Sequence, residues 1–90
     1  MDKSDEERVR CDAFNLSHQL VARAYDELPH APVTVAASIL ALICELDKVQ
    51  ISKYDVAKRT GVDYPAFVMM SHQMDKLLRA GTISHPKPLD

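Results

Sequence analysis

The chain has 90 residues, of which 47% are apolar, and its formal net charge is −2. This length is that of one small domain, and the apolar content excludes a chain that is wholly disordered. The charge excludes the strongly basic balance of a nonspecific nucleic-acid binder, although a local basic patch remains compatible with it.

Only two glycines occur, and residues such as Ala, Leu, Val, Met, Glu and Lys dominate. This composition favours an all-α domain. The sequence contains no charged-then-apolar leader and no apolar run long enough to cross a membrane. We therefore expect a cytoplasmic protein that does not associate with membranes.

The first expected helix covers residues 4–28. Ser4 and Glu7 fit a capping box at its start, and Pro29 ends it. Its apolar residues recur at three- and four-residue intervals, which predicts a broad apolar face. A helix this long, with such a face, predicts that part of it packs against a second subunit in a homodimer.

The second expected helix, VAASILALICELDK, follows Thr34, which we expect to cap it. Because this segment is apolar nearly all round, we expect it to be the central and most buried helix.

Residues 51–70, ISKYDVAKRTGVDYPAFVMM, read as two helices joined by a tight turn. Ser52 and Asp55 fit a capping box for the first helix, and Gly61 fits its left-handed end. Asp63 fits the cap of the second helix, with Pro65 in its first turn. Inward-facing residues are expected at Val56, Ala57, Val62, Phe67 and Met70. This pattern predicts a helix-turn-helix.

The second helix of this motif is expected to continue to Ala80, with Gly81 just beyond its end. Thr82, Ile83 and Ser84 suggest one short strand, and the tail is expected to be exposed and irregular. Residues 1–90 are thus predicted to form one all-α, four-helix domain. Its helix-turn-helix core covers residues 34–80 and its tail residues 82–90.

Two segments of the chain, ISKYDVAKRTGV and DKLLRAGTIS, resemble winged helix-turn-helix regulators of the multiple-antibiotic-resistance (MarR) type. The segment VTVAASILALICEL resembles the helix that precedes the motif in that family. The resemblance implies a DNA-binding fold and a homodimer built by the N-terminal helix. It also implies a small transcriptional regulator of prokaryotic, phage or plasmid type.

The sequence departs from the MarR pattern after Gly81, because only nine residues follow and two of them are proline. We therefore expect no wing and no C-terminal dimerisation helix. The second motif helix is also about one turn longer than is usual in that family.

If the motif binds DNA, Lys53, Lys58 and Arg59 are expected to contact phosphates, since the first helix of such motifs crosses the backbone. The second helix is expected to enter the major groove. Its candidate contact residues are Tyr64, Val68, Met69, His72, Gln73 and Lys76.

Apolar atoms dominate this expected reading face, whereas base edges present hydrogen-bond donors and acceptors. An alternative function is therefore protein–protein interaction, in which the apolar strip Tyr64, Val68 and Met69 docks onto a partner, as in a small phage inhibitor or accessory factor. Two other interpretations stay open. The three cations of the first motif helix can simply be its solvent-exposed face, and the apolar strip can belong to the core if the second helix is rotated.

No catalytic or cofactor motif is recognisable in this sequence. It has no Gly-rich phosphate loop and no nucleophile elbow, so we expect no enzymatic activity. The four histidines have no partner at ligand spacing, whether another histidine, a cysteine or a carboxylate, and we expect no metal or other cofactor. Cys11 and Cys44 have no CxxC spacing and are expected to be free, at least partly buried thiols.

Overall fold

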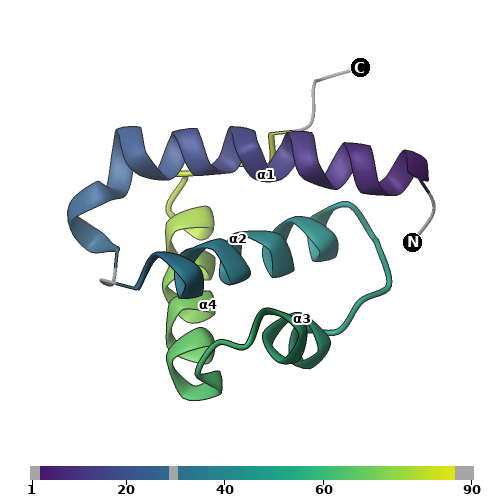
Figure 1. Cartoon of the computed structure of the whole chain (residues 1–90). Helices are drawn as coiled ribbons and strands as arrows, with labels where there is room; N and C mark the ends of the chain where they lie inside the picture. Colours follow the sequence, from purple (N-terminus) through teal and green to yellow (C-terminus); the bar gives the residue numbers. More distant parts are fainter. Residues whose placement is uncertain (1–2, 29–30, 87–90) are drawn as a thin grey trace.

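The computed structural model describes residues 3–28 and 31–86 and consists of helices (Figure 1). They are α1 (Lys3–Ala24), the 3-10 helix η1 (Tyr25–Glu27), α2 (Pro32–Leu46), α3 (Lys53–Thr60) and α4 (Tyr64–Arg79). No strand occurs in these two described stretches. The all-α, four-helix prediction with a long N-terminal helix is confirmed. None of the described helices is long and apolar enough to cross a membrane.

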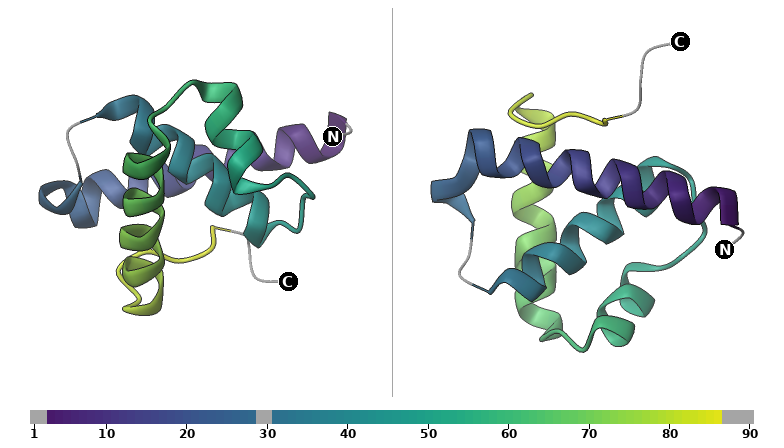
Figure 2. Two further views of the ribbon diagram at one scale, coloured as in Figure 1. Left: turned by 90° about the horizontal axis from the view of Figure 1, so that it is seen from below. Right: turned by 45° about the horizontal axis from the view of Figure 1, so that its top comes forward.

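Helix α2 lies at the centre of the molecule, with α1 on one side, α3 on the other and α4 crossing it (Figures 1 and 2). Its apolar composition on nearly all sides explains this position, because three other helices pack against it. The prediction that this helix is central and most buried is confirmed. Its buried residues are Thr34, Ala37, Ser38, Ile39, Ala41, Leu42, Ile43 and Cys44.

The core divides into two clusters that differ in size. The larger joins α1, α2, α4 and Ile83, and its buried members are Val9, Leu16, Leu20, Ala24, Ile39, Leu42, Ile43, Cys44, Met70, Met74, Leu77 and Ile83. The smaller joins α2, α3 and α4 through Ala37, Ala41, Val56, Ala57 and Phe67. Burying one large side chain contributes about 1.5–3 kcal/mol. Helix α3 therefore depends mainly on Phe67, the one large member of the smaller cluster.

The caps of α3 and the start of α4 follow the sequence prediction. The Ser52 hydroxyl accepts a hydrogen bond from the Asp55 backbone N–H at 3.1 Å. Gly61 ends α3 with φ of 71°, a left-handed conformation that costs glycine no steric energy. The Asp63 carboxylate accepts a bond from the Ala66 N–H at 3.2 Å. These caps place the start of α4 beside the end of α3.

The predicted starts of α1 and α2 are wrong by two and three residues. Helix α1 begins at Lys3, so Ser4 lies inside the helix and cannot cap it. Helix α2 begins at Pro32, whose missing N–H loses no bond in a first turn, and Thr34 is a buried first-turn residue. Regular α-helix ends at Ala24 and tightens into η1. The predicted helix stop at Pro29 lies outside the described residues.

The segment after α4 is not the predicted strand. The N–H of Thr82 bonds to the Leu77 carbonyl at 3.0 Å and that of Gly81 to the Leu78 carbonyl at 3.1 Å, so the chain reverses at a left-handed Gly81. Gln19 then accepts a bond from the Ser84 N–H at 2.8 Å and donates one to the Ser84 carbonyl at 3.0 Å. The Gln19 side-chain amide thus makes the two hydrogen bonds with Ser84 that a neighbouring strand would make in a sheet. Residues 87–90 of the predicted tail lie outside the described residues.

Lys48 has a left-handed backbone, with φ of 60°, where α2 ends. The Val49 N–H bonds to the Cys44 carbonyl at 2.8 Å, and the Lys48 N–H bonds to the Glu45 carbonyl at 3.2 Å. A residue with a Cβ is strained in this conformation by about 1 kcal/mol.

We expect Lys48→Gly to raise the free energy of unfolding by about 0.5–1 kcal/mol, since relief of strain outweighs the added freedom of the unfolded chain. Urea denaturation followed by circular dichroism measures the change. Lys48→Ala is the matched control, because it removes the same side chain and keeps the Cβ. An equal gain in both variants would contradict the strain explanation.

Candidate functional site

The three predicted phosphate-contacting residues of α3 are all exposed, but they differ in their partners. Lys53 pairs with Glu45, Nζ to Oε2 at 3.7 Å. Lys58 and Arg59 form no ion pair with any residue in the described part of the chain. They occupy the last turn of α3, next to the turn that leads into α4. The two cations best placed to meet an external anion are therefore Lys58 and Arg59.

Helix α4 presents one continuous exposed stripe. Its members are Pro65, Met69, His72, Lys76 and Arg79, spaced three or four residues apart. The opposite side of the helix buries Phe67, Met70, Met74 and Leu77. The sequence prediction named Met69, His72 and Lys76 but omitted Arg79 from the site. Arg79 lies three residues after Lys76, so helical spacing predicts that both are on the same face of the helix.

Tyr64 and Val68 lie on a different flank of α4. Val68 is half-buried against the smaller core cluster, so the predicted apolar strip is not uniformly exposed. Gln73 is also half-buried. A cleft of about 190 Å³ runs along the flank and is lined by Lys53, Tyr64, Phe67, Val68, Ser71, His72 and Asp75. The carboxylate in this cleft makes it a poor place for a phosphate.

Exposed aromatic and apolar groups gather where α3 meets α4. The Tyr54 and Tyr64 rings make an edge contact with centroids 5.8 Å apart. Tyr64 also stacks on buried Phe67 at 6.1 Å, which connects the surface rings to the core. Met69 is 73% exposed. We call Tyr54 and Tyr64 the aromatic patch; Met69 lies on the exposed stripe of α4, away from the flank of Tyr64.

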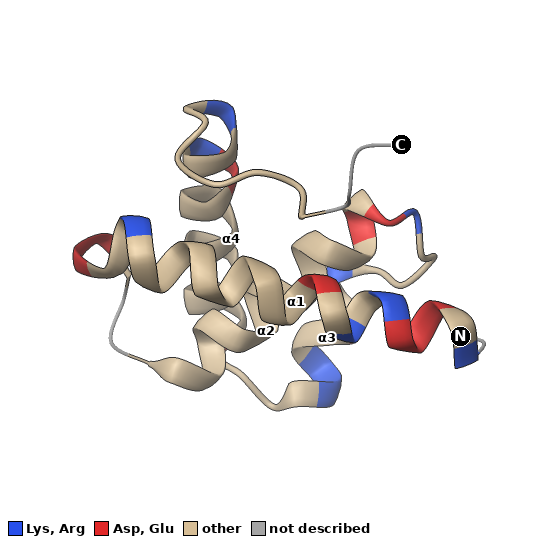
Figure 3. Cartoon of the chain, turned by 90° about the horizontal axis from the view of Figure 1, so that it is seen from above, with Lys and Arg blue, Asp and Glu red and all other residues tan. Residues whose placement is uncertain are grey.

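The basic residues do not form one surface. In Figure 3 the Lys and Arg positions of α3 and those near the C-terminal end of α4 lie at separate parts of the molecule. Acidic and basic residues alternate near the N-terminal end of α1, where Arg8 pairs with Asp5 and Arg10 with Glu6. The charges near the start of α1 are thus paired, whereas Lys58 and Arg59 at the end of α3 form no ion pair with a described residue.

Helix α1 has a second apolar face that no described residue covers. Phe14, Val21 and Tyr25 are each more than 60% exposed. A groove of about 670 Å³ lies beside this face, between α1 and α2. It is lined by Ser17, Leu20, Val21, Tyr25, Asp26, Leu28, Pro32, Val35, Ala36 and Ile39. Large neighbouring apolar groups on a small domain are typical of an interaction surface.

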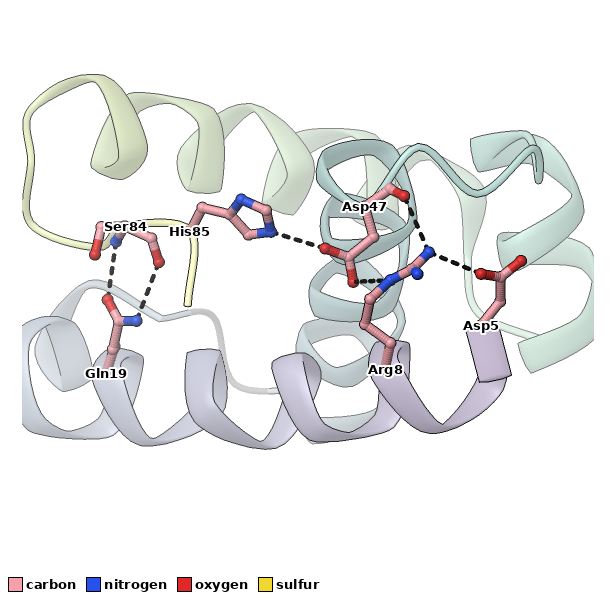
Figure 4. Close-up of polar contacts among 6 residues, drawn as sticks. All are labelled: Asp5, Arg8, Gln19, Asp47, Ser84 and His85. Carbon is pink, nitrogen blue, oxygen red and sulfur yellow. Dashed lines mark hydrogen bonds and ion pairs between the residues drawn. The ribbon is translucent and has the colours of Figure 1, made fainter. Parts of the chain in front are cut away.

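A polar cluster joins α1 to the end of α2 and to the segment after α4 (Figure 4). The Asp47 side chain is fully buried, and its Oδ1 lies 2.7 Å from His85 Nε2. Its Oδ2 lies 3.9 Å from Arg8 Nε, and Arg8 donates to the Asp47 backbone carbonyl at 3.3 Å. The Arg8 guanidinium also pairs with Asp5 at 2.8 Å.

Asp12 belongs to the same cluster and is only 8% exposed. Burial raises the pKa of its carboxyl, and hydrogen bonding and charge repulsion with Asp47 raise it further. His85 and Arg8 act in the opposite direction and do not reverse the shift. Sequence reasoning did not identify this cluster. The sequence signal that could have identified it is the position of Asp12, which lies on the same face of the helix as the apolar residues Val9 and Leu16.

The two cysteines differ in burial. Cys44 is buried and Cys11 is exposed, and both are free thiols. The prediction of partial burial is therefore wrong for Cys11, which lies on the outer side of α1. Burial raises the pKa of the Cys44 thiol, and the charge of Asp47 adds to the effect. This thiol is thus a packing group and a poor nucleophile.

Comparison with known proteins identifies no relative of this chain. No protein-family model, no curated protein and no solved structure matches the chain.

Proposed function

We propose that this protein is a small DNA-binding regulator that uses α3 and α4 as a helix-turn-helix. The observation that carries the proposal is the pair Lys58 and Arg59, exposed and without described ion pairs beside the turn into α4. In helix-turn-helix complexes the first helix of the motif meets the phosphate backbone, and the start of the second enters the major groove. The MarR-like sequence of residues 51–62 supports the same assignment.

On this proposal the exposed stripe of α4 faces the groove. His72 supplies the polar group for base edges, and Met69 supplies apolar contact with a thymine methyl. Lys76 and Arg79 follow the stripe toward its end and meet the flanking phosphates. Tyr64 lies at the entry of the helix, beside the end of α3. Val68 contributes to packing and not to base contact, because it is half-buried.

The four phosphate contacts proposed for one chain, those of Lys58, Arg59, Lys76 and Arg79, give weak binding, so the proposal includes a homodimer. The exposed face of Phe14, Val21 and Tyr25 on α1 supports it, as does the groove beside that face. A symmetric pairing of two α1 helices would cover the same residues on both copies.

Light scattering coupled to size-exclusion chromatography tests the dimer. We expect the mass of two chains for the natural protein and of one chain for Val21→Glu, because a charge in an apolar interface is costly. Ala22→Glu is the control, since Ala22 is exposed one residue further round the same helix. A single-chain mass for the natural protein at tens of micromolar would remove the dimer from the proposal.

DNA binding is tested by selecting ligands from a pool of random duplexes and measuring their mobility shift at two salt concentrations. We expect Lys58→Ala/Arg59→Ala to weaken binding by about tenfold or more at low salt. The slope of log affinity against log salt should flatten by about 0.9 for each phosphate that the variant no longer neutralises.

The matched control is Lys3→Ala/Arg10→Ala, which removes the same charge from exposed positions of α1. It should leave binding close to that of the natural chain. Equal weakening by both double variants would show that only net charge matters. Absence of any shifted duplex at micromolar protein and low salt would reject the DNA-binding proposal.

The aromatic patch favours a second candidate function, docking of a protein partner onto the helix-turn-helix. Aromatic side chains are enriched at protein interfaces, and both tyrosines of the patch are exposed. The two candidates differ in the residues that they require. A partner would depend on Tyr54 and tolerate Lys58→Ala/Arg59→Ala, whereas DNA binding would depend on Lys58 and Arg59 and tolerate the loss of Tyr54.

A further inference from the structure

We infer that Asp12, Asp47 and His85 form a binding site for a divalent transition-metal ion of the Zn²⁺ class. Each residue offers one ligand atom, and the three atoms lie within 4.8 Å of one another. The residues come from α1, from the end of α2 and from the segment after α4. This inference is independent of DNA binding, because none of the three residues belongs to α3 or α4.

Each carboxylate of the cluster has one oxygen without a hydrogen-bond donor among the described residues. Oδ2 of Asp12 and Oδ2 of Asp47 are both buried without a hydrogen-bond partner in the part of the chain that the structure describes. Asp12 is 8% exposed and the Asp47 side chain 0%. Two ionised carboxylates that face each other away from water repel, and they can share a hydrogen bond only if one takes up a proton. Their arrangement therefore requires added positive charge.

The neighbouring cations do not fully supply that charge. Arg8 Nε is 3.9 Å from Asp47 Oδ2, and its guanidinium makes shorter contacts with Asp5 at 2.8 Å and the Asp47 backbone carbonyl at 3.3 Å. His85 Nε2 contacts the other oxygen of Asp47, Oδ1. A divalent ion between the carboxylates would bond directly to Oδ2 of Asp12 and Oδ2 of Asp47, which have no hydrogen-bond partner among the described residues.

The donor set indicates the kind of ion. One imidazole nitrogen with two carboxylate oxygens suits Zn²⁺ and its neighbours, whereas Mg²⁺ and Ca²⁺ prefer oxygen ligands alone. Bonds to Zn²⁺ of about 2.0–2.2 Å place tetrahedral ligand atoms about 3.3 Å apart. His85 Nε2 would leave its present contact with Asp47 Oδ1 at 2.7 Å, and the ligand atoms of the three residues, now within 4.8 Å of one another, would close to about that spacing. The irregular segment of His85 allows this shift, and water would take the fourth position.

Metal binding would join three parts of the chain that Gln19 and the core otherwise hold together. The segment of His85 already bonds to Gln19 through Ser84. A metal ion would add a direct link from this segment to α1 and α2. The bound ion should therefore raise thermal stability and not merely occupy the surface.

The test uses the full chain in a Cys11→Ser background, which removes the exposed thiol as a competing ligand. After treatment with EDTA and buffer exchange, Zn²⁺ is titrated by calorimetry, and melting is followed with and without Zn²⁺. We expect one ion per chain and a rise in Tm of about 5 °C or more at saturating Zn²⁺. Mg²⁺ should give no rise. Loss of the zinc effect in both His85→Gln and Asp12→Asn would support the site.

Two further variants separate the site from adventitious binding. His72→Gln removes an exposed histidine of α4 and should leave the titration unchanged. Arg8→Gln removes a competing positive charge and should tighten Zn²⁺ binding several-fold. A zinc effect that survives in His85→Gln would overturn the inference. So would the absence of any zinc effect in the natural protein, which would leave a shared proton as the neutralising charge.

Discussion

Replacing Phe67 with alanine is expected to lower the free energy of unfolding by about 3–5 kcal/mol. Phe67 is 1% exposed and is the one large side chain in the cluster that holds α3 to α2 and α4. The other members, two of them the alanines of α2, cannot refill the cavity. Because domains of this size are stable by only about 5–15 kcal/mol, this loss removes a large part of the total.

Urea denaturation followed by circular dichroism measures the effect of Phe67→Ala. Met69→Ala is the matched control, since Met69 is on the same helix and 73% exposed, and it should change stability by less than about 0.5 kcal/mol. Amide hydrogen exchange should also show that α3 opens before the larger cluster does in Phe67→Ala. Similar losses of stability in the two variants would contradict the burial of Phe67 between α3, α2 and α4.

Asp12→Asn is expected to stabilise the protein, which is an unusual result for a buried polar residue. In metal-free buffer near neutral pH we expect a gain of about 1–3 kcal/mol. The asparagine amide can donate a hydrogen bond to Asp47 Oδ2, which has no hydrogen-bond partner in the described residues, and the repulsion between the carboxylates disappears. Loss of the attraction to Arg8 and His85 is smaller, because the net effect of folding is to raise the pKa of Asp12.

The gain from Asp12→Asn should depend on pH in a defined direction. Because folding raises the pKa of Asp12, ionisation of this carboxyl favours the unfolded chain. The natural protein therefore loses stability as the pH rises through that pKa, whereas the variant does not. The gain should shrink as the pH falls below about 4, where this carboxyl binds a proton in the unfolded chain as well as in the folded one.

Thermal melts of both proteins at several pH values, with EDTA present, check this dependence. Asp26→Asn is the control, because it makes the same change at an exposed carboxylate of η1. Destabilisation by Asp12→Asn at neutral pH would show that Asp12 is held by partners that outweigh its burial.

The local signals of the helix-turn-helix were readable from sequence because each depends on neighbours within a few residues. The Ser52 and Asp63 caps and the left-handed Gly61 act over one turn of chain, and all three are confirmed. The beginnings of α1 and α2 were harder to place, because several nearby residues could serve as a first turn. Pro32, not Thr34, decided where α2 begins.

The surface of the motif needed the tertiary structure. Val68 and Met69 are adjacent in sequence and equally apolar, yet one is half-buried and the other 73% exposed. Only the position of α3 against α4 separates them. The same applies to Thr82–Ser84, whose sequence suits a strand but whose backbone bonds to the Gln19 amide, 65 residues away in sequence from Ser84.

The sequence by itself determined the helical class, the long first helix, the central second helix and the caps of the motif, because these follow from periodicity and local hydrogen bonding. Only the tertiary structure decided that Asp12, Asp47 and His85 meet. No spacing rule joins residues so far apart along the chain. Their meeting depends on how α1 packs on α2 and where the chain turns after Gly81.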